Sequence, residues 1–505
     1  MSGRTVRWLT ADQLGPHFDD GGPTLLIENA GLLARRPMHW AKAHLILSAI
    51  RHRAAEARAD GEPLEFVRAD SYREVLQERL DAGDRIEMVA GSSHGLRALA
   101  SELDLDVLPS RGFVTSEADF DAWRAGRSLK GLKMDDFYRW WRSRSGVLMD
   151  GPSSPVGGQF SFDADNRQPP PKGASTLGLP DPWRPQEDDI DAGVRADLQR
   201  WSSEGRIRLL GRDGPRRFAV TRTEAQKALD DFIATRLGDF GPFEDAMLAD
   251  DAVMAHSQLS VPLNLGVLDP NEVIDRVCRE FEAGRAPLAS VEGIIRQIAG
   301  WRDWVWHLYW QLGEDYIPRS NALGARSPLP AQWWQLDGSG VAAACLGDVL
   351  DKVGERGWAH HIERLMVLGN WALQRGFDPA ELNDWFTNAF VDGTPWVMPA
   401  NVVGMSQHAD GGLVATKPYA AGGAYISKMS NYCGGCRFNP KVRVGAEACP
   451  FTAGYWAFLD RVEPRIRGNH RMAQTLGGLR QLADRDAVVA QERLRDPGTA
   501  NLPSG

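Results

Sequence analysis

Four of the five cysteines lie in a pattern that is typical of a metal centre. Cys433-Gly-Gly-Cys436 is followed after twelve residues by Cys449, and Cys345 could supply a fourth thiolate from elsewhere. Four soft ligands suit either a tetrahedral zinc ion or an iron–sulfur cluster. The proline directly after Cys449 favours a cluster, and the spacing departs from that of paired-CxxC zinc ribbons. Zinc and free structural thiols are the alternatives.

A histidine pair, His360-His361, opens an apolar segment of helical periodicity. Adjacent residues on a helix point about 100° apart, so this pair is poorly placed to hold one metal ion. One histidine could instead face a cavity as an acid or base while the other lies in the core. Two structural histidines are the alternative.

Two further polar patterns indicate a buried binding site. Glu292 and Arg296 are i, i+4 neighbours, which is normally a surface ion pair, but in this apolar, Trp-rich segment we expect them to line a cavity. Ser257 and Ser260 stand before an apolar segment, where hydroxyls and free backbone N–H groups can hold phosphate. An ordinary helix N-cap is the alternative for the serines.

The composition limits the class of protein to which these residues belong. The chain has 505 residues, of which 25% are charged and 43% hydrophobic, and its net charge is −9. No run of apolar residues is long enough to cross a membrane, and we see no secretory signal, so the expected location is the cytoplasm. An acidic chain has no global field that attracts nucleic acid, so any DNA binding needs a local basic groove.

The elements that must position these residues differ along the chain. Short β-rich runs alternate with helical patterns over residues 1–130, which predicts a Rossmann-like α/β domain with a parallel sheet. Residues 131–215 are rich in proline and glycine in part and are predicted to be an interdomain linker. Residues 216–485 are predicted to form a large all-α domain, and residues 486–505 a flexible tail.

Taken together, the sequence resembles the photolyase/cryptochrome family, in its bacterial iron–sulfur branch that includes (6-4) photolyases. The match extends over nearly the whole chain in conserved order and spacing. The segments that carry it include Ala11–Leu14, Ser48–His52, Phe137–Arg139, Asp163–Pro169, Phe218–Glu224, His256–Ser260, Glu292–Asp303, His360–Asn370, Met405–Gly412 and Tyr432–Pro450.

The resemblance implies three cofactors. It places FAD in the helical domain and a [4Fe–4S] cluster on Cys345, Cys433, Cys436 and Cys449. It places an antenna chromophore, 6,7-dimethyl-8-ribityllumazine, in the α/β domain. The residues expected to bind FAD are Ser257, Leu259, Ser260, Asn264, Glu292, Arg296, Asp392 and Met398.

The resemblance also implies an activity: light-dependent repair of (6-4) pyrimidine photoproducts in UV-damaged DNA by a monomeric lyase. His360 and His361 would be the active-site histidines. Trp385 and Trp334 would relay an electron to the excited flavin. The residues expected to contact DNA phosphates are Arg167, Lys417 and Arg437.

Three residues depart from the pattern of the repair enzymes. Met398 stands where an acidic residue is expected near flavin N5, Phe386 where a tyrosine is often found, and Leu32 where the antenna site has a polar residue. These changes favour an alternative function, a cryptochrome-like photoreceptor that regulates gene expression. A third hypothesis is a zinc-bearing structural DNA-binding protein without flavin.

Overall fold

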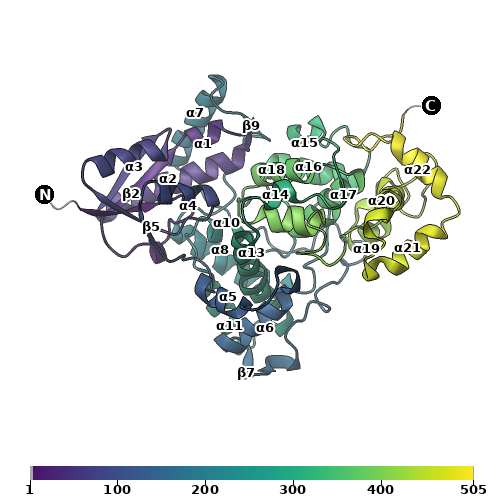
Figure 1. The fold of residues 1–505 in the computed structure, drawn as a ribbon, viewed down its shortest axis with the longest axis horizontal. Coiled ribbons are helices and arrows are strands. Elements are labelled where there is room, and N and C mark those ends of the chain that lie inside the picture. Colours follow the sequence, from purple (N-terminus) through teal and green to yellow (C-terminus); the bar gives the residue numbers. More distant parts are fainter. Residues whose placement is uncertain (1–3, 504–505) are drawn as a thin grey trace.

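A five-stranded parallel sheet forms the N-terminal part of the computed structural model, which describes residues 4–503 (Figure 1). The strand order is β4-β2-β1-β5-β6. The order therefore reverses between β1 and β5, where ligands of open α/β folds commonly bind. The strands are β1 (Thr5–Leu9), β2 (Thr24–Asn29), β4 (Leu64–Ala69), β5 (Arg85–Val89) and β6 (Asp106–Leu108).

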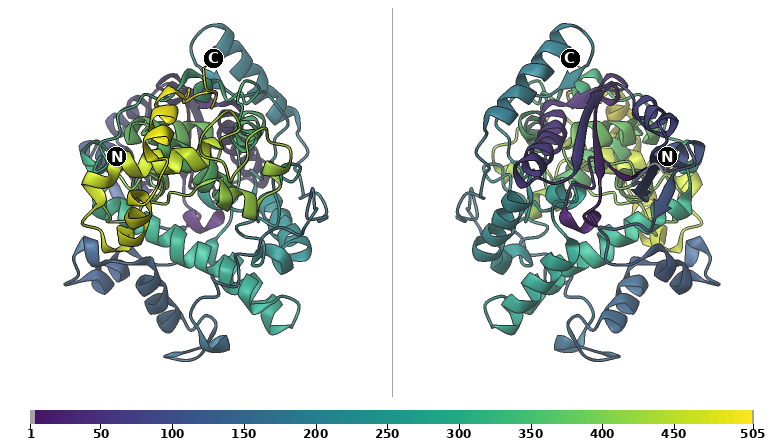
Figure 2. Two further views of the ribbon diagram at one scale, coloured as in Figure 1. Left: turned by 90° about the vertical axis from the view of Figure 1, so that its right-hand side faces the viewer. Right: turned by 90° about the vertical axis from the view of Figure 1, so that its left-hand side faces the viewer.

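Helices cover both faces of this sheet (Figure 2). Val6 and Trp8 pack on one side with α3 (Tyr72–Asp81) and α4 (His94–Glu102). Leu9 packs on the other side with residues of α2 (Trp40–Asp60), in a core that continues into the helical domain. The alternation of side chains along β1 is what places its apolar residues on both faces.

The connecting region contains helices of its own. The predicted linker carries α6 (Met134–Ser145) and α7 (Asp189–Ser203), the latter packed against α2. Between these helices the chain forms a small β7 (Met149–Gly151) and β8 (Ser154–Pro155) hairpin and long irregular stretches.

The remainder of the chain is helical, which confirms the predicted fold class of an α/β domain followed by a large all-α domain. Among the residues that the structure describes, no helix has both the length and the apolar character needed to cross a bilayer. The helices that matter below are α8 (Arg222–Thr235), α10 (Ser260–Asn264), α12 (Leu288–Ile295), α13 (Asp303–Leu312), α16 (Ala344–Arg356), α18 (Pro379–Ala389) and α20 (Pro450–Ile466).

The segment expected to be a flexible tail instead packs on the helical domain as far as the structure describes it. It contains α22 (Arg485–Leu494), which lies against α20. The indole N–H of Trp371 donates to the carbonyl of Pro497 at 2.9 Å, and Ala342 N donates to Thr499 O at 2.8 Å. The prediction rested on the polar composition of this segment, which does not reveal the few apolar and backbone contacts that hold it in place. The last two residues of the expected tail, 504–505, lie outside the described part, as do residues 1–3 of the expected α/β domain.

A buried ion pair joins the linker to the helical domain. Asp191 of α7 caps its own helix and accepts two hydrogen bonds from Arg216, at 2.9 and 3.0 Å. Arg216 also donates to Glu224 of α8. Both members of the Asp191–Arg216 pair have side chains that are 1% exposed or less. Hydrogen bonds from His52 and Arg216 hold the pKa of Asp191 well below its usual range against the effect of burial.

We predict that Arg216→Met lowers the free energy of unfolding by about 3–5 kcal/mol, because it leaves the Asp191 carboxylate buried without its partner. Arg206→Met is the matched control. Its ion pair with Asp70 is exposed on both sides, so we expect a change below about 1 kcal/mol. Urea denaturation of both variants measures the difference, and equal midpoints would contradict the role of the buried pair.

Candidate functional site

The four predicted thiolates come from three separate segments of the helical domain. Cys345 lies in α16, Cys433 in the short turn Tyr432–Gly434, Cys436 just after it, and Cys449 directly before α20. None of them forms a disulfide. Burial raises the pKa of the Cys345 thiol, and the other three cysteines raise it further, so all four lie near one another.

In the described residues, two groups of metal-ligating side chains have all their ligand atoms within 4.8 Å of one another, and neither group includes a cysteine.

A buried polar network connects this cysteine segment to the histidine pair. Tyr432, next to Cys433, has its hydroxyl 2.7 Å from a carboxylate oxygen of Glu363 and 2.8 Å from Asp348. Lys352 donates to the same Glu363 oxygen at 2.9 Å. That oxygen lies 3.6 Å from Nε2 of His360, and both of these side chains are completely buried.

The histidine pair lies beside a third histidine that the sequence did not assign to the pair. Ring nitrogens of His256, His360 and His361 lie within 4.8 Å of one another, and the His256 and His360 rings stack at 4.7 Å. The helix begins only at His361, so the helical angle that separates adjacent side chains does not apply to His360.

The two members of the pair differ in the direction of their pKa shifts. His360 is fully buried, and burial, followed by the charges of His361, Lys352 and Arg364, lowers its pKa well below the usual value. The side chain of His361 is 48% exposed, with Nε2 3.4 Å from an oxygen of Asp245. Removal from water lowers the pKa of His361, but the hydrogen bond to Asp245 and the nearby Glu244 raise it overall. Of the two, His361 therefore binds a proton more readily.

Asp392 is the centre of a second cluster. Ser260 Oγ donates to its carboxylate at 2.8 Å, and Asn264 Nδ2 donates to its carbonyl at 3.3 Å. Arg364 forms a two-pronged ion pair with the carboxylate, at 2.8 and 3.1 Å. Ser260, Asn264 and Asp392 are thus brought together as predicted for one site, whereas Arg364 was missed because nothing in its local sequence marks it.

Lys42 is a second residue that the sequence did not indicate. It extends from α2 of the sheet domain and donates to the carbonyls of Thr387 and Gly393, both at 2.6 Å. Burial lowers its pKa to about 8, while the neighbouring Asp392 raises it. A buried cation of the first domain therefore fixes the backbone on both sides of Asp392.

Glu292 and Arg296 are buried, as expected for residues that line an internal site. Phe162 N donates to Glu292 at 3.0 Å, and Arg296 pairs with Asp163 at 3.0 Å, so the linker loop is attached to this helix. Burial raises the pKa of Glu292 despite the nearby Arg296.

The helix widens to π-type turns over Arg296–Arg302, and the same happens at Glu363–Gly369 and Pro399–Ser406. Such turns are frequent at functional sites.

Trp385, one member of the predicted tryptophan pair, contacts Trp333, the neighbour of the other member, Trp334. Trp385 is fully buried, and its indole N–H donates to the carbonyl of Trp333 at 2.7 Å. The rings of Trp385 and Trp333 lie 4.9 Å apart, so Trp333, rather than its neighbour Trp334, is the ring next to Trp385. Met398 is buried in the same core cluster as Trp385, and so is Phe386, whose ring lies 5.0 Å from that of Trp385. Leu259 is buried and Ser257 lies at the wall of a separate cavity.

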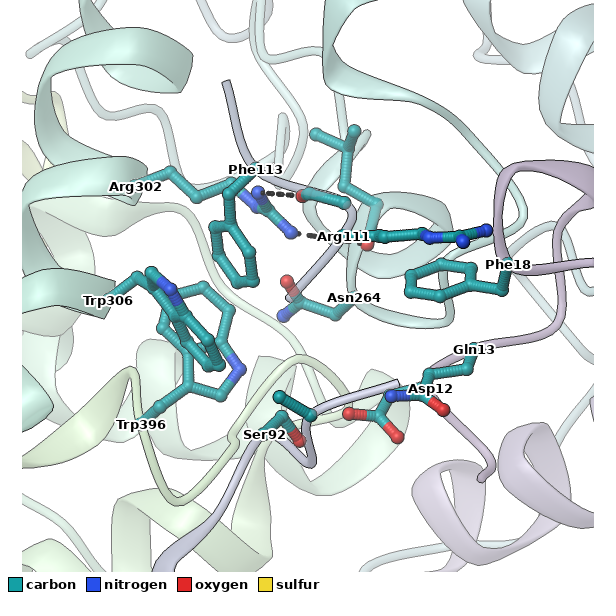
Figure 3. A pocket seen from close by; sticks show the side chains of 13 residues that line it. Asp12, Gln13, Phe18, Ser92, Arg111, Phe113, Asn264, Arg302, Trp306 and Trp396 are labelled. Carbon is teal, nitrogen blue, oxygen red and sulfur yellow. Dashed lines mark hydrogen bonds between the residues drawn. The ribbon is translucent and has the colours of Figure 1, made fainter. Parts of the chain in front are cut away.

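A small cavity of about 20 Å³ lies where the sheet meets the helical domain (Figure 3). Asp12 and Gln13 border it from the end of β1, and Ser92 from the end of β5, at the reversal of strand order. Trp306 and Trp396 form aromatic walls on the helical side. Arg302 donates to Gly112 O at 2.8 Å and Leu263 O at 3.3 Å, and burial lowers its pKa to about 10. Lining residues that complete the cavity are Phe18, Ala90, Arg111, Gly112, Phe113, Leu263 and Asn264.

An α/β domain joined to a helical domain with this cysteine pattern is the architecture of photolyase-related proteins. Residues 7–206 match the family model described as "Deoxyribodipyrimidine photo-lyase-related protein". The sequence is 40% identical over 457 residues to the (6-4) photolyase of Agrobacterium fabrum, a match that covers 86% of each chain. The protein therefore belongs to the photolyase/cryptochrome family.

Solved structures agree in fold. A bacterial class III photolyase from Agrobacterium tumefaciens superposes with a TM-score of 0.55 at 17% identity, covering 83% of this chain and 82% of that one. The cryptochrome of Synechocystis sp. PCC6803 gives 0.56 at 13% identity, with coverage of 92% and 89%. At these identities the likeness establishes the fold alone.

We predict that Tyr432→Phe lowers the free energy of unfolding by about 1–3 kcal/mol, because it removes the hydroxyl that joins Asp348 and Glu363 in a buried network. Tyr419→Phe is the control, since Tyr419 is exposed and should change stability by less than about 0.5 kcal/mol. Denaturant titrations followed by circular dichroism compare the two. Indistinguishable midpoints would show that the network does not stabilise the fold.

Proposed function

We propose that this protein is a light-driven (6-4) photolyase, a lyase that repairs (6-4) pyrimidine photoproducts in UV-damaged DNA. The observation that carries the proposal is the 40% identity to a (6-4) photolyase over 86% of both chains. The half-exposed His361, whose pKa is raised, supports it together with the buried His360, because reversal of this lesion needs a proton delivered by a group that titrates near neutral pH.

FAD is the cofactor that this proposal requires. When bound and reduced, FAD supplies the electron on absorbing blue light, which no side chain can do. Buried polar atoms of His256, His360 and Glu292 have no hydrogen-bond partner among the described residues. Such atoms are costly unless a ligand completes them, and they fit a polar cofactor. Residues that would hold it are Ser257, Leu259, Ser260, Asn264, Glu292, Arg296, Asp392 and Met398, with Arg364 added by the structure.

The chain's own groups perform the remaining tasks. The carboxylate of Asp245 favours a proton on Nε2 of His361, and this proton would be donated to the lesion. Lys352 donates to Glu363, whose carboxylate oxygen lies beside Nε2 of His360. Trp385 offers a buried ring for electron relay, with Trp333 in contact and Trp334 next in sequence. The lesion must leave the DNA stack to reach buried groups, as in base-flipping enzymes, among which photolyases are counted.

The other parts of the proposal concern the metal centre, the antenna and DNA. Cys345, Cys433, Cys436 and Cys449 would hold a [4Fe–4S] cluster, which the proximity of the other three cysteines to Cys345 supports. An antenna chromophore such as 6,7-dimethyl-8-ribityllumazine would bind in the α/β domain, beside the small aromatic-walled cavity at the end of β1 and β5. DNA phosphates would meet exposed cations at Arg167, Lys417 and Arg437; Arg167 is partly neutralised by its ion pair with Asp163.

The direct test is illumination of the reduced protein with an oligonucleotide that contains one (6-4) photoproduct. We expect restored thymines on chromatography after blue light and none in the dark. Persistence of the lesion while the flavin photoreduces normally would reject repair. A cryptochrome-like photoreceptor, which Met398 and Phe386 favour, would then be the better interpretation, and a deletion strain should lose blue-light gene regulation without losing UV survival.

We predict that His361→Ala lowers the yield of (6-4) repair at least 100-fold, because general-acid catalysis contributes about 10²–10⁴-fold. In the wild type, repair should fall as pH rises through the raised pKa of His361. Asp245→Asn removes the main group that raises this pKa, so the fall should move to lower pH. The other titratable or charged groups near His361 are Glu244, His256, His360 and Arg364.

Photoreduction of the flavin is the control for both variants and should not change. An unshifted pH profile in the Asp245→Asn protein would contradict the assignment of His361 as the proton donor.

We predict that Cys436→Ala prevents recovery of folded, flavin-loaded protein, because the proposed metal centre joins three separate segments of the helical domain. Cys278→Ala is the control, since Cys278 is a partly buried core thiol away from the centre. Yield and the broad absorption near roughly 400 nm expected of such clusters are measured for both. Normal yield of the Cys436 variant, or a zinc content of one atom per wild-type chain, would contradict the cluster.

A further inference from the structure

The C-terminal helix α22 holds the loop that connects two of the predicted thiol ligands. The chain between Cys436 and Cys449 is an irregular loop. Gln491 of α22 accepts a hydrogen bond from Gly445 N at 2.8 Å and donates one to Arg443 O at 3.2 Å. The same helix lies against α20, which begins directly after Cys449 (Figure 1). It therefore connects the loop before this cysteine with the helix after it.

A buried triad of charged side chains lies where α22 meets this part of the helical domain. Arg375 pairs with Glu492 of α22 at 2.8 Å, and Arg495, just after the helix, donates to the same carboxylate at 2.8 and 3.0 Å. The three side chains are 6% exposed or less. Among the residues that the structure describes, neither arginine has a second acidic partner within 4 Å. Two buried cations therefore share one carboxylate, and one positive charge is left without a counter-charge.

Cys449 lies beside this triad. Arg375 donates to the carbonyl of Pro450 at 2.8 Å, and Pro450 directly follows Cys449 in the chain. Burial is the largest effect on the pKa of Arg375 and lowers it, whereas Glu492 and the nearby Cys449 raise it. Nε of Arg375 and one Nη of Arg495 are buried and have no hydrogen-bond partner among the described residues. The excess positive charge of the triad is therefore next to a predicted thiolate ligand.

A centre of four cysteines has the charge that the triad lacks. Cysteine binds a metal as the thiolate, and four thiolates carry more negative charge than one zinc ion or one [4Fe–4S] core neutralises. A buried negative centre and a buried positive triad are each unfavourable alone, because both have lost their contact with water. When the two lie side by side, each reduces the cost of burying the other.

We propose that the Arg375–Glu492–Arg495 triad supplies the counter-charge for the thiolate centre and that α22 positions it. The inference rests on the metal centre of the proposed function, whether that centre holds iron or zinc. The three residues are positioning residues, since none of them ligates the metal. The centre then depends on the C-terminal helix for the retention of its metal. A cluster would also depend on it for its reduction potential, which the net charge around a cluster helps to set.

The first test measures the rate at which the full-length protein, as purified with its cofactors, loses metal to excess EDTA. Arg375→Gln removes the cation beside Cys449, and we expect metal release to be at least tenfold faster. Arg495→Gln removes the other cation and is the second variant if Arg375→Gln does not fold. Arg236→Gln is the matched control. Arg236 is also buried and pairs with Asp231 at 3.1 Å, but its hydrogen bonds go to segments without cysteines, so release should change less than twofold. Unchanged release in the triad variants, or equal acceleration in the control, would overturn the proposal.

The second test separates charge from structural support through the midpoint reduction potential of the cluster. Glu492→Gln keeps the shape of the side chain but removes the negative charge, so both cations remain. We expect the potential to fall in Arg375→Gln and to rise in Glu492→Gln, because loss of a cation disfavours an added electron and loss of an anion favours it. Spectroelectrochemical titration measures both shifts. Shifts of the same sign, or no shift in either variant, would contradict a role in charge compensation.

Metal analysis of the wild type distinguishes failure of this proposal from failure of the proposed function. Iron supports the cluster, and both tests then apply. Zinc would contradict the cluster, while the release rates would still decide whether the triad compensates the thiolates. A protein purified with neither metal would overturn both, because the triad would have no charged centre to compensate. None of these measurements uses light or DNA, so they are independent of the outcome of the repair assay.

Discussion

A charge that leaves water must find a partner, and in this protein those partners come from segments far apart in the chain. Arg364 and Asp392 are separated by 28 residues, Lys352 and Tyr432 by 80, and Lys42 and Gly393 by 351. Because breaking one buried partnership costs several kcal/mol, each of these contacts fixes two segments at once. The candidate site is therefore positioned by pairings between domains and loops rather than by any single helix.

The hydrogen-bond network around Glu363 connects the cysteine segment to the histidine pair. Tyr432 belongs to the turn that carries Cys433, and its hydroxyl reaches the carboxylate that supports His360. A change in the positions of the thiols would move Tyr432 and, through Glu363, would alter the surroundings of His360. The contacts of Tyr432 thus connect the cysteine segment to the surroundings of His360.

Repair and light signalling depend on different features of the same architecture. In the proposed repair reaction, His361 and its partner Asp245 would serve the chemistry on the lesion. Met398, a buried thioether, can neither carry a proton nor donate a strong hydrogen bond. The histidines and Met398 would act in separate steps of the reaction. A methionine at this position is therefore compatible with repair when the proton comes from the histidines.

The sequence by itself determined the fold class, because alternating strand and helix periods are local and readable, and the spacing of Cys433, Cys436 and Cys449 predicted a thiol group to which the family resemblance added Cys345. It also indicated that Glu292 and Arg296 are buried. The tertiary structure alone decided that Arg364 pairs with Asp392, that Lys42 holds the backbone near it, that Trp333 rather than Trp334 contacts Trp385, and that residues 485–500 pack on α20 and neighbouring segments. These are long-range pairings of side chains whose local sequence is ordinary for exposed arginine, lysine or tail residues. A local pattern records which face of a helix is apolar, but it holds no information about which distant charge that face will meet.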